Sequence, residues 1–257
     1  MNQVLTHLPT SLLLAETTNV ELSDTDRYNS WKLSAFYIAM EQVSAHHVAI
    51  QNYSNESLIL QNRTWVLSRN RIKFLRWSTA GETVSILTWA KGLRQKILYV
   101  RDYEFRDASD NVIALASSAW LVVDLVSRRF LPPAISQVEM PLLDRESISE
   151  ELGRIAHPAN LREVYQIRAT YSNIDFLNHV NNARYLDWVM DAFPMDFHAR
   201  YAPDWLQINY SNEVRPEEVI SIQVAEPMDN QPNWIIIGEK TGLREKAFEV
   251  EMNWRKR

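Results

Sequence analysis

The chain of 257 residues has no cysteine and only five glycines. Without a thiol it can form no disulfide, no cysteine-ligated zinc site and no covalent intermediate on a cysteine. The few glycines compose neither a G-x-G-x-x-G sequence nor a Walker phosphate loop. Cysteine-dependent catalysis and the common glycine-rich nucleotide sites are therefore excluded before any motif is considered.

Long hydrophobic runs and a basic leader are also missing. No window of about 18 apolar residues occurs, so we expect no membrane span. The first twenty residues carry a single short apolar run, 12–15, and fit neither a signal peptide nor a transit peptide. These absences predict a cytoplasmic location. With a net charge of −5 and no basic domain or zinc finger, the sequence predicts no nucleic-acid partner.

Metal ligands are scarce as well. Of the six histidines, His46 and His47 are adjacent, and on a helix they would diverge by about 100° instead of chelating one ion. We expect no metal and no cofactor. The composition, with 46% hydrophobic and 23% charged residues, is typical of a globular protein with one large or two small cores.

What the chain does contain is a dense polar cluster in SNIDFLNHVNNARYLDW, residues 172–188. Asp175, Asn178 and His179 precede apolar residues at helical spacing, so the cluster falls where a helix begins. A helix start offers unpaired amides that can hold a carbonyl oxygen as it gains charge. His179 can move protons near neutral pH, and Asp175 can orient it. The competing interpretation is an asparagine-rich helix cap with a satisfied histidine.

A family resemblance favours the first interpretation. The segment HVNNARYLDW resembles the HVNN-x-x-Y-x-x-W segment of the plant and bacterial acyl-acyl carrier protein thioesterases. Four further blocks are similar to that family's first half and stand in its order: WVLSRNRIKF, TWAKG, RDYEFRD and ASSAWLVVDLVSRR. The resemblance implies an α+β fold, a double hot-dog, in which two tandem domains each wrap an antiparallel sheet around a long helix. Because the plant members carry an organelle leader, we expect a bacterial protein.

The sequence also repeats itself. TDRYNSWKLSAFYIAMEQ (25–42) aligns without a gap on IDFLNHVNNARYLDWVMD (174–191), and ETVSI (82–86) aligns on EVISI (218–222). Each half then predicts a helix followed by strands, at 62–77, 82–91, 96–106 and 111–126 in the first half and at 205–214, 219–226, 233–238 and 246–254 in the second. We expect a domain at 1–135, a linker at 136–160 with a short helix at 145–154, and a domain at 161–257.

Catalytic groups are expected in the second half alone. In the two alignments Ser30 stands in the position of His179, and Trp77 lies opposite Glu213. The family places a carboxylate after the strand that follows its catalytic helix, and the resemblance implies Glu213 for this role. Many plant members have cysteine directly after that glutamate, where this chain has Val214. A water route remains, with Glu213 or Asp175 as general base and His179 protonating the thiolate or polarising the carbonyl.

One position departs from the family pattern. The family usually has asparagine two residues before the histidine, where this chain has Leu177. Leucine cannot hydrogen-bond a substrate, so Asn178 takes the role through a local shift, Asn181 does, or the step proceeds differently. The candidate catalytic set is therefore Asp175, His179, Glu213 and Asn178.

The partners are predicted from surface chemistry and from the resemblance. Arg69, Arg71 and Lys73 alternate along a predicted strand, with Arg76 beyond, and share one face that suits either an acidic carrier protein or plain solvent. The first half also holds most of the tryptophans expected in either an acyl tunnel or ordinary sheet packing, namely Trp31, Trp65, Trp77, Trp89 and Trp120. A homodimer is compatible with the sequence.

The interpretation that follows is a fatty acyl-acyl carrier protein thioesterase, a hydrolase of fatty acid biosynthesis and lipid metabolism that releases free fatty acid and ends chain elongation. Three alternatives stay open: an acyl-CoA thioesterase of the same fold, a hot-dog dehydratase, and a non-catalytic acyl-binding protein. Chain-length preference is not predicted.

Overall fold

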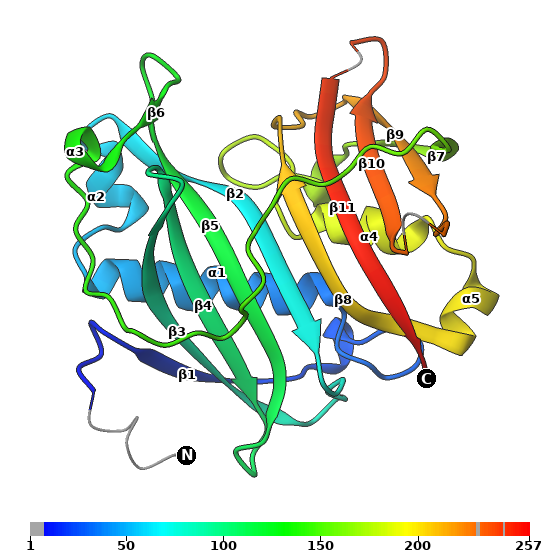
Figure 1. The fold of residues 1–257 in the computed structure, drawn as a ribbon, viewed down its shortest axis with the longest axis horizontal. Helices are drawn as coiled ribbons and strands as arrows, with labels where there is room; N and C mark the ends of the chain where they lie inside the picture. Colours follow the sequence, from blue (N-terminus) through cyan, green and yellow to red (C-terminus); the bar gives the residue numbers. More distant parts are fainter. Residues whose placement is uncertain (1–7, 230–231, 244) are drawn as a thin grey trace. The chain divides into compact units, whose positions relative to one another are not determined.

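The computed structural model describes residues 8–229, 232–243 and 245–257 (Figure 1). The predicted first domain begins at residue 1, so its first seven residues lie outside the described ranges. The chain divides into two compact units. The first unit ends at residue 152 and excludes 33–37, which group with the second unit, 153–257. No helix in the described part of the chain is long and apolar enough to cross a membrane.

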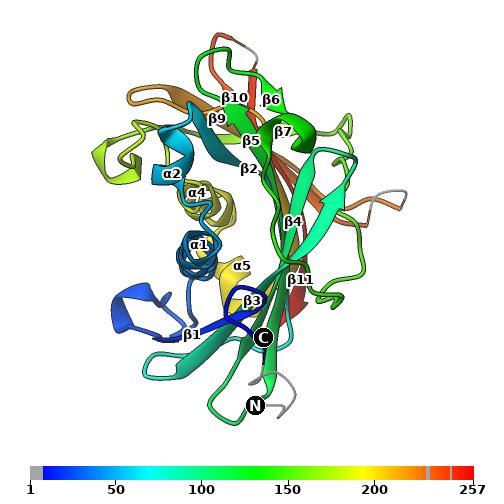
Figure 2. The same cartoon turned by 90° about the vertical axis from the view of Figure 1, so that its left-hand side faces the viewer.

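The first unit is an antiparallel sheet with helix α1 (Leu33–Ile50) at one face, apart from the first turn of α1, which groups with the second unit. Its sheet order is β1-β3-β4-β5-β2, and the short β6 pairs with β5. Figure 2 views α1 nearly end-on. The bounds are β1 (Leu14–Asn19), the 3₁₀ turn η2 (Leu22–Asp24), α2 (Asn55–Ile59), β2 (Arg63–Phe74), β3 (Thr83–Arg94), β4 (Leu98–Arg106), β5 (Val112–Asp124), β6 (Phe130–Leu131) and α3 (Pro133–Ser136).

The second unit repeats this plan. Its antiparallel sheet has the order β7-β9-β10-β11-β8, which is the order of the first sheet with each strand replaced by its counterpart. The bounds are β7 (Arg162–Arg168), the 3₁₀ turn η3 (Tyr171–Asn173), α4 (Arg184–Asp191), α5 (Met195–Arg200), β8 (Tyr201–Tyr210), β9 (Val219–Ala225), β10 (Trp234–Lys240) and β11 (Glu245–Lys256). The predicted α+β hot-dog arrangement is confirmed, and the eight predicted strands are present within a few residues of their expected ends.

The helices follow from the spacing of their buried residues. In α1, Phe36, Met40, Val43 and His47 are buried and recur every three or four residues, so they form one face. The second unit's helix is shorter than the long helix we expected. It ends at Asp191, because proline at 194 cannot continue a helix and disfavours helical geometry in the residue before it.

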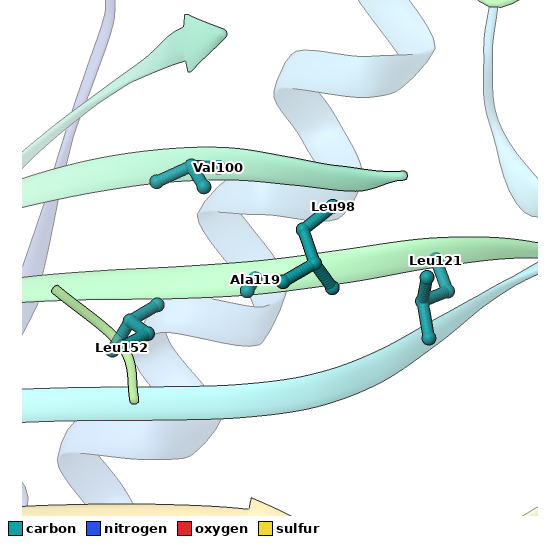
Figure 3. Close-up of a cluster of buried hydrophobic side chains, with 5 residues drawn as sticks. All are labelled: Leu98, Val100, Ala119, Leu121 and Leu152. Atoms are coloured by element: carbon teal, nitrogen blue, oxygen red, sulfur yellow. The ribbon is translucent and has the colours of Figure 1, made fainter. Parts of the chain in front are cut away.

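The predicted helix at 145–154 is wrong. This segment has no helical residue, because its backbone bonds to residues of the sheet instead: Arg145 O accepts from Trp89 Nε1, and Ser147 N donates to the carboxylate of Asp102. The segment is also anchored by burial. Leu152 packs on Leu98, Val100, Ala119 and Leu121 of β4 and β5 (Figure 3). Residues 143–152 are thus an extended strap over the first sheet.

Candidate active site

The site is built on a tight turn between η3 and α4. Ile174 and Val180 form an isolated antiparallel bridge, and inside it Asp175 N donates to His179 O over 2.9 Å while Asn178 N donates to Asp175 O over 3.0 Å. The Asp175 side chain closes the turn, because its Oδ1 accepts from Leu177 N over 2.9 Å. The backbone hydrogen bonds alone therefore keep Asp175 and His179 close together, independently of any contact between their side chains.

The turn fixes the tautomer of His179. Its Nδ1 lies 3.4 Å from Asp175 Oδ2 and 3.3 Å from Val180 O. Both neighbours can only accept, so Nδ1 carries a proton. Nε2 makes no hydrogen bond to any residue that the structure describes. The two side chains are 19% and 17% exposed, which leaves them accessible but shielded enough to interact.

A second loop brings Glu213 alongside this turn. Val180 N donates to Val214 O over 2.8 Å, so the neighbour of His179 is bonded to the neighbour of Glu213. The electrostatics agree. Burial raises the pKa of the Tyr185 hydroxyl above its usual value, and the charges of Glu213 and Asp175 add to this effect. The structure thus brings the segment that holds Glu213 against the turn that holds Asp175 and His179.

Asn178 has a conformational reason to be asparagine. It is exposed and adopts a φ of 63°, a left-handed conformation that asparagine tolerates better than most residues. Its counterpart Asn29 has a φ of 58° in the half without the histidine. The turn alone therefore accounts for asparagine here, and the predicted chemical role of Asn178 stays a prediction. Leu177 presents an apolar side chain that is 46% exposed.

The expected row of unpaired amides at the helix start is wrong in part. The amides of Val180, Asn181 and Ala183 donate to Val214 O, Asn173 O and Asn181 Oδ1, respectively. These amides already have hydrogen-bond partners within the protein, so they are not free to bind a carbonyl oxygen. The first turn of α4 is also distant in sequence, because α4 begins at Arg184, five residues after His179. An oxyanion would have to be held by other groups, His179 Nε2 among them.

The first unit holds the same turn without its histidine. Asp26 N donates to Ser30 O over 2.8 Å, Asn29 N donates to Asp26 O over 3.0 Å, and Trp31 N donates to Ser78 O over 2.8 Å. Ser30 stands where His179 stands. Trp77, opposite Glu213 in the alignment, stacks on Phe74 with ring centroids 4.1 Å apart. This end of the first unit is a folded copy that carries no imidazole and no carboxylate in the Glu213 position.

Sequence reasoning missed one polar contact of the site. The helical spacing of the residues after His179 gives Tyr185 a place in the core but no polar role, yet its hydroxyl accepts from Val214 N over 3.3 Å. The alignment with Phe36 held the relevant signal, because the two aromatic residues differ only by this hydroxyl.

The basic residues of β2, and Arg76 just beyond its end, are largely engaged within the first unit. Arg69 donates to Leu152 O, Arg71 lies 4.0 Å from Glu150, and Arg76 pairs with Glu82 and Asp107. Lys73 is exposed. Across the described ranges, no three histidine, aspartate or glutamate side chains are grouped so as to hold a metal ion.

Two family models divide the chain between them. The acyl-ACP thioesterase N-terminal domain, in which ACP denotes acyl carrier protein, matches residues 12–135, and the acyl-ACP thioesterase C-terminal domain matches residues 157–256. The chain belongs to the acyl-ACP thioesterase family. The turn with Asp175 and His179 and the loop with Glu213 both lie in the part that matches the family's C-terminal domain.

Curated relatives in this family are distant in sequence. The palmitoyl-acyl carrier protein thioesterase of Cuphea hookeriana is 23% identical over 200 residues, which are 70% of this chain and 47% of the relative. The oleoyl-acyl carrier protein thioesterase 2 of Arabidopsis thaliana is 20% identical over 224 residues, 79% of this chain and 59% of the relative. This acyl-ACP thioesterase family member spans about half the length of the curated relatives it matches.

Solved structures share the fold over nearly the whole chain. An acyl-ACP thioesterase from Bacteroides thetaiotaomicron superposes with a TM-score of 0.86 at 22% identity, covering 95% of this chain and 98% of that one. The 12:0-ACP thioesterase from Umbellularia californica gives a TM-score of 0.80 at 14% identity with the same coverage of both chains. At these identities the likeness establishes the hot-dog fold of this family member.

Proposed function

We propose that this chain hydrolyses the thioester of fatty acyl-acyl carrier protein, releasing free fatty acid and ending chain elongation. One observation carries the proposal. The hydrogen bond from Val180 N to Val214 O joins the segment that holds His179 to the segment that holds Glu213, in the unit that matches the family's C-terminal domain. The equivalent bond in the first unit joins segments that hold Ser30 and Trp77. Acid–base groups are thus paired in one unit only.

The chemistry proposed is direct attack by water. Glu213 accepts a proton from the water as its oxygen adds to the thioester carbonyl carbon. Asp175 is the less suitable base, because Oδ1 closes the turn and Oδ2 faces the imidazole. In the doubly protonated form of His179, Nε2–H donates to the carbonyl oxygen and then gives its proton to the departing thiolate. Solvent returns the proton from Glu213 to His179, and the products are a carboxylic acid and a thiol.

The organisation we propose assigns residues 1–135 to acyl-chain binding, 136–160 to the linker and 161–257 to catalysis. The family matches, which end at 135 and resume at 157, support these bounds. We further propose a bacterial, cytoplasmic enzyme, as a monomer or homodimer, with the acyl carrier docking on Arg69, Arg71, Lys73 and Arg76. Lys73 is the exposed member of this set and contributes most to the encounter with an acidic partner.

The test compares acyl-carrier and acyl-CoA substrates of several chain lengths, with thiol release as the readout. Glu213→Gln should lower kcat about a hundredfold, to a residual rate that can still be measured, and leave substrate binding intact, because the amide keeps the size but cannot accept a proton. Mass spectrometry of acid-quenched enzyme should show no acyl adduct. An acylated residue that forms and decays as fast as turnover would overturn the water mechanism. Faster hydrolysis of acyl-CoA than of acyl carrier would overturn the substrate assignment.

A separate variant tests the docking face. Lys73→Glu should raise KM for the acyl-carrier substrate several-fold and leave KM for the same acyl group on CoA unchanged, because the charge acts on the carrier and not on the acyl chain. Equal changes for both substrates would contradict docking at β2.

A further inference from the structure

The loop that presents Glu213 is anchored by three hydrogen bonds on successive backbone groups. Val214 O accepts from Val180 N over 2.8 Å, and Val214 N donates to the Tyr185 hydroxyl over 3.3 Å. Arg215 N donates to Glu218 Oε2 over 2.8 Å. Glu213 itself is exposed, so the position of its carboxylate depends on how firmly this stretch of backbone is held.

Two of these three anchors are also present in the first unit. Trp31 N donates to Ser78 O over 2.8 Å, and Thr79 N donates to Glu82 Oε1 over 3.0 Å. The third anchor is absent there, because Phe36 occupies the position of Tyr185 and has no hydroxyl. The general fold of the loop therefore needs only two anchors. The third anchor, the bond to the Tyr185 hydroxyl, occurs in the second unit, where the loop carries Glu213 at the position of Trp77.

Tyr185 is suited to hold an atom in place. It is 3% exposed, and its ring lies against Trp188, Phe248 and Tyr210 with centroids 5.3, 5.1 and 5.8 Å away. A ring packed on three sides cannot swing its oxygen away from Val214. Burial also raises the pKa of the hydroxyl, so the group stays neutral at physiological pH and acts through its hydrogen bonds, not as an acid or base.

We propose that the Tyr185 hydroxyl is a positioning group, which fixes the Glu213 loop beside the Asp175–His179 turn by holding the amide of Val214. This inference rests on the proposed function, in which Glu213 is the general base. Without the hydroxyl, the loop keeps its bond through Val214 O but loses the bond on the amide adjoining Glu213. A displacement of about 1 Å in a reacting group is enough to slow a reaction severely.

The variant that tests this proposal is Tyr185→Phe. It removes only the hydroxyl and gives the second unit the residue type that Phe36 provides in the first half. The fold should survive, because the aromatic ring and its packing are retained. We expect kcat with acyl-carrier substrate to fall about tenfold and KM to stay within twofold, since the loss concerns the base and not substrate binding. Tyr165→Phe is the matched control. The partly buried Tyr165 hydroxyl, on β7, donates to Trp188 O of α4 and not to the loop that holds Glu213, so kcat should be unchanged.

A double-mutant cycle separates positioning of Glu213 from a general effect on stability. In the Glu213→Gln background there is no base left to position, so adding Tyr185→Phe should lower the residual rate no further. An additive tenfold loss in the double variant would overturn the proposal, because the hydroxyl would then act independently of Glu213. A Tyr185→Phe enzyme with unchanged kcat would overturn it as well.

Hydrogen exchange distinguishes failure of this inference from failure of the proposed function. The Val214 amide should be protected in the native chain and in Tyr165→Phe, and should lose protection in Tyr185→Phe. This readout needs no substrate. Full activity in Glu213→Gln would overturn both the base assignment and the positioning role, whereas unchanged Val214 protection in Tyr185→Phe would overturn the positioning role alone.

Discussion

The turn before α1 and the turn before α4 follow one backbone path and present different side chains. In each turn an aspartate N–H donates to the carbonyl four residues on, and an asparagine occupies the left-handed position. The difference lies in what the aspartate does. Asp26 Oδ1 accepts from the amides of both Tyr28 and Ser30, whereas Asp175 Oδ1 accepts from Leu177 N and Oδ2 faces His179. The two turns therefore share a backbone conformation and differ in a few side chains, of which His179 is the one that can transfer protons.

This comparison also limits which residues can be assigned a chemical role. A residue that has the same conformation and the same part in both turns is explained by the turn itself, as Asn29 and Asn178 are. Glu82 and Glu218 are a second such pair, because each accepts from the amide three residues before it. What remains specific to the second unit is His179, Glu213 and the Tyr185 hydroxyl.

The largest expected effect comes from removing the imidazole. His179→Ala should reduce thioester hydrolysis at least a hundredfold, the usual scale for loss of an acid–base group, while the fold is retained because the turn is held by backbone bonds. Ser30→Ala, the matched change in the first unit, should alter the rate less than twofold. Steady-state assays on both variants measure this. Near-full activity of folded His179→Ala would remove the central assignment.

The repeat is the part of the site that the sequence predicts well. Aligning 25–42 on 174–191 pairs Asp26 with Asp175 and Asn29 with Asn178, because backbone conformation constrains those residue types strongly. Period-two runs of valine, isoleucine and aromatic residues likewise predict the eight long strands. The edge strands β1 and β7 were not predicted, since each is short and carries polar residues on its exposed face.

Long-range contacts account for what the sequence does not predict. Nothing in 145–154 signals that Ser147 will bond to Asp102 and Leu152 will cover β4 and β5, so the local pattern suggested a helix. The same strap receives the side chain of Arg69 and approaches Arg71, which turns an apparent solvent-facing stripe into a partly internal one. The hydroxyl bond of Tyr185 is equally invisible, because its partner is a backbone amide 29 residues away.

A second prediction sharpens the contrast between the two aspartates. Asp175→Asn should lower kcat/KM about tenfold, because the amide that replaces Oδ2 cannot reliably accept from Nδ1–H and the imidazole loses its orientation. Asp26→Asn should leave activity within twofold, since asparagine keeps the acceptor that Tyr28 N and Ser30 N require. Kinetics and urea unfolding of both variants provide the measurement. A comparable loss of activity in Asp26→Asn would show that the first turn takes part in catalysis.

The first unit also contains a buried pair formed by a histidine and an arginine. His47 is fully buried, with Nδ1 2.5 Å from Arg101 Nη1 and Nε2 3.1 Å from Ser11 O. Burial and the adjacent Arg101 charge lower the pKa of His47 to about 4. The unfolded chain therefore binds a proton at this residue more readily than the folded one. The stability that the neutral imidazole contributes is complete above pH 6.5 and is lost as the pH falls towards 4.

The measurable consequence is a pH dependence assigned to one residue. Between pH 7.5 and 5.5 the free energy of unfolding should fall by about 1 kcal/mol more in the native chain than in His47→Gln. Urea unfolding at the two pH values gives this difference. Equal pH dependence in the native chain and His47→Gln would contradict the lowered pKa.

The smallest expected effect concerns the size of a buried residue on the first unit's helix. The repeat pairs Ala39 on α1 with Trp188 on α4, both buried at 7% and 2% exposure, so the first helix presents a methyl group where the second presents an indole. If the first unit binds the acyl chain, the larger side chain in Ala39→Trp should leave less room for it. The ratio of kcat/KM for shorter to longer acyl groups should then rise about threefold. Ala45→Trp, on the exposed face of α1, should leave the ratios unchanged. Equal loss of rate for all chain lengths in Ala39→Trp would indicate overpacking alone, and unchanged ratios would place the acyl chain elsewhere.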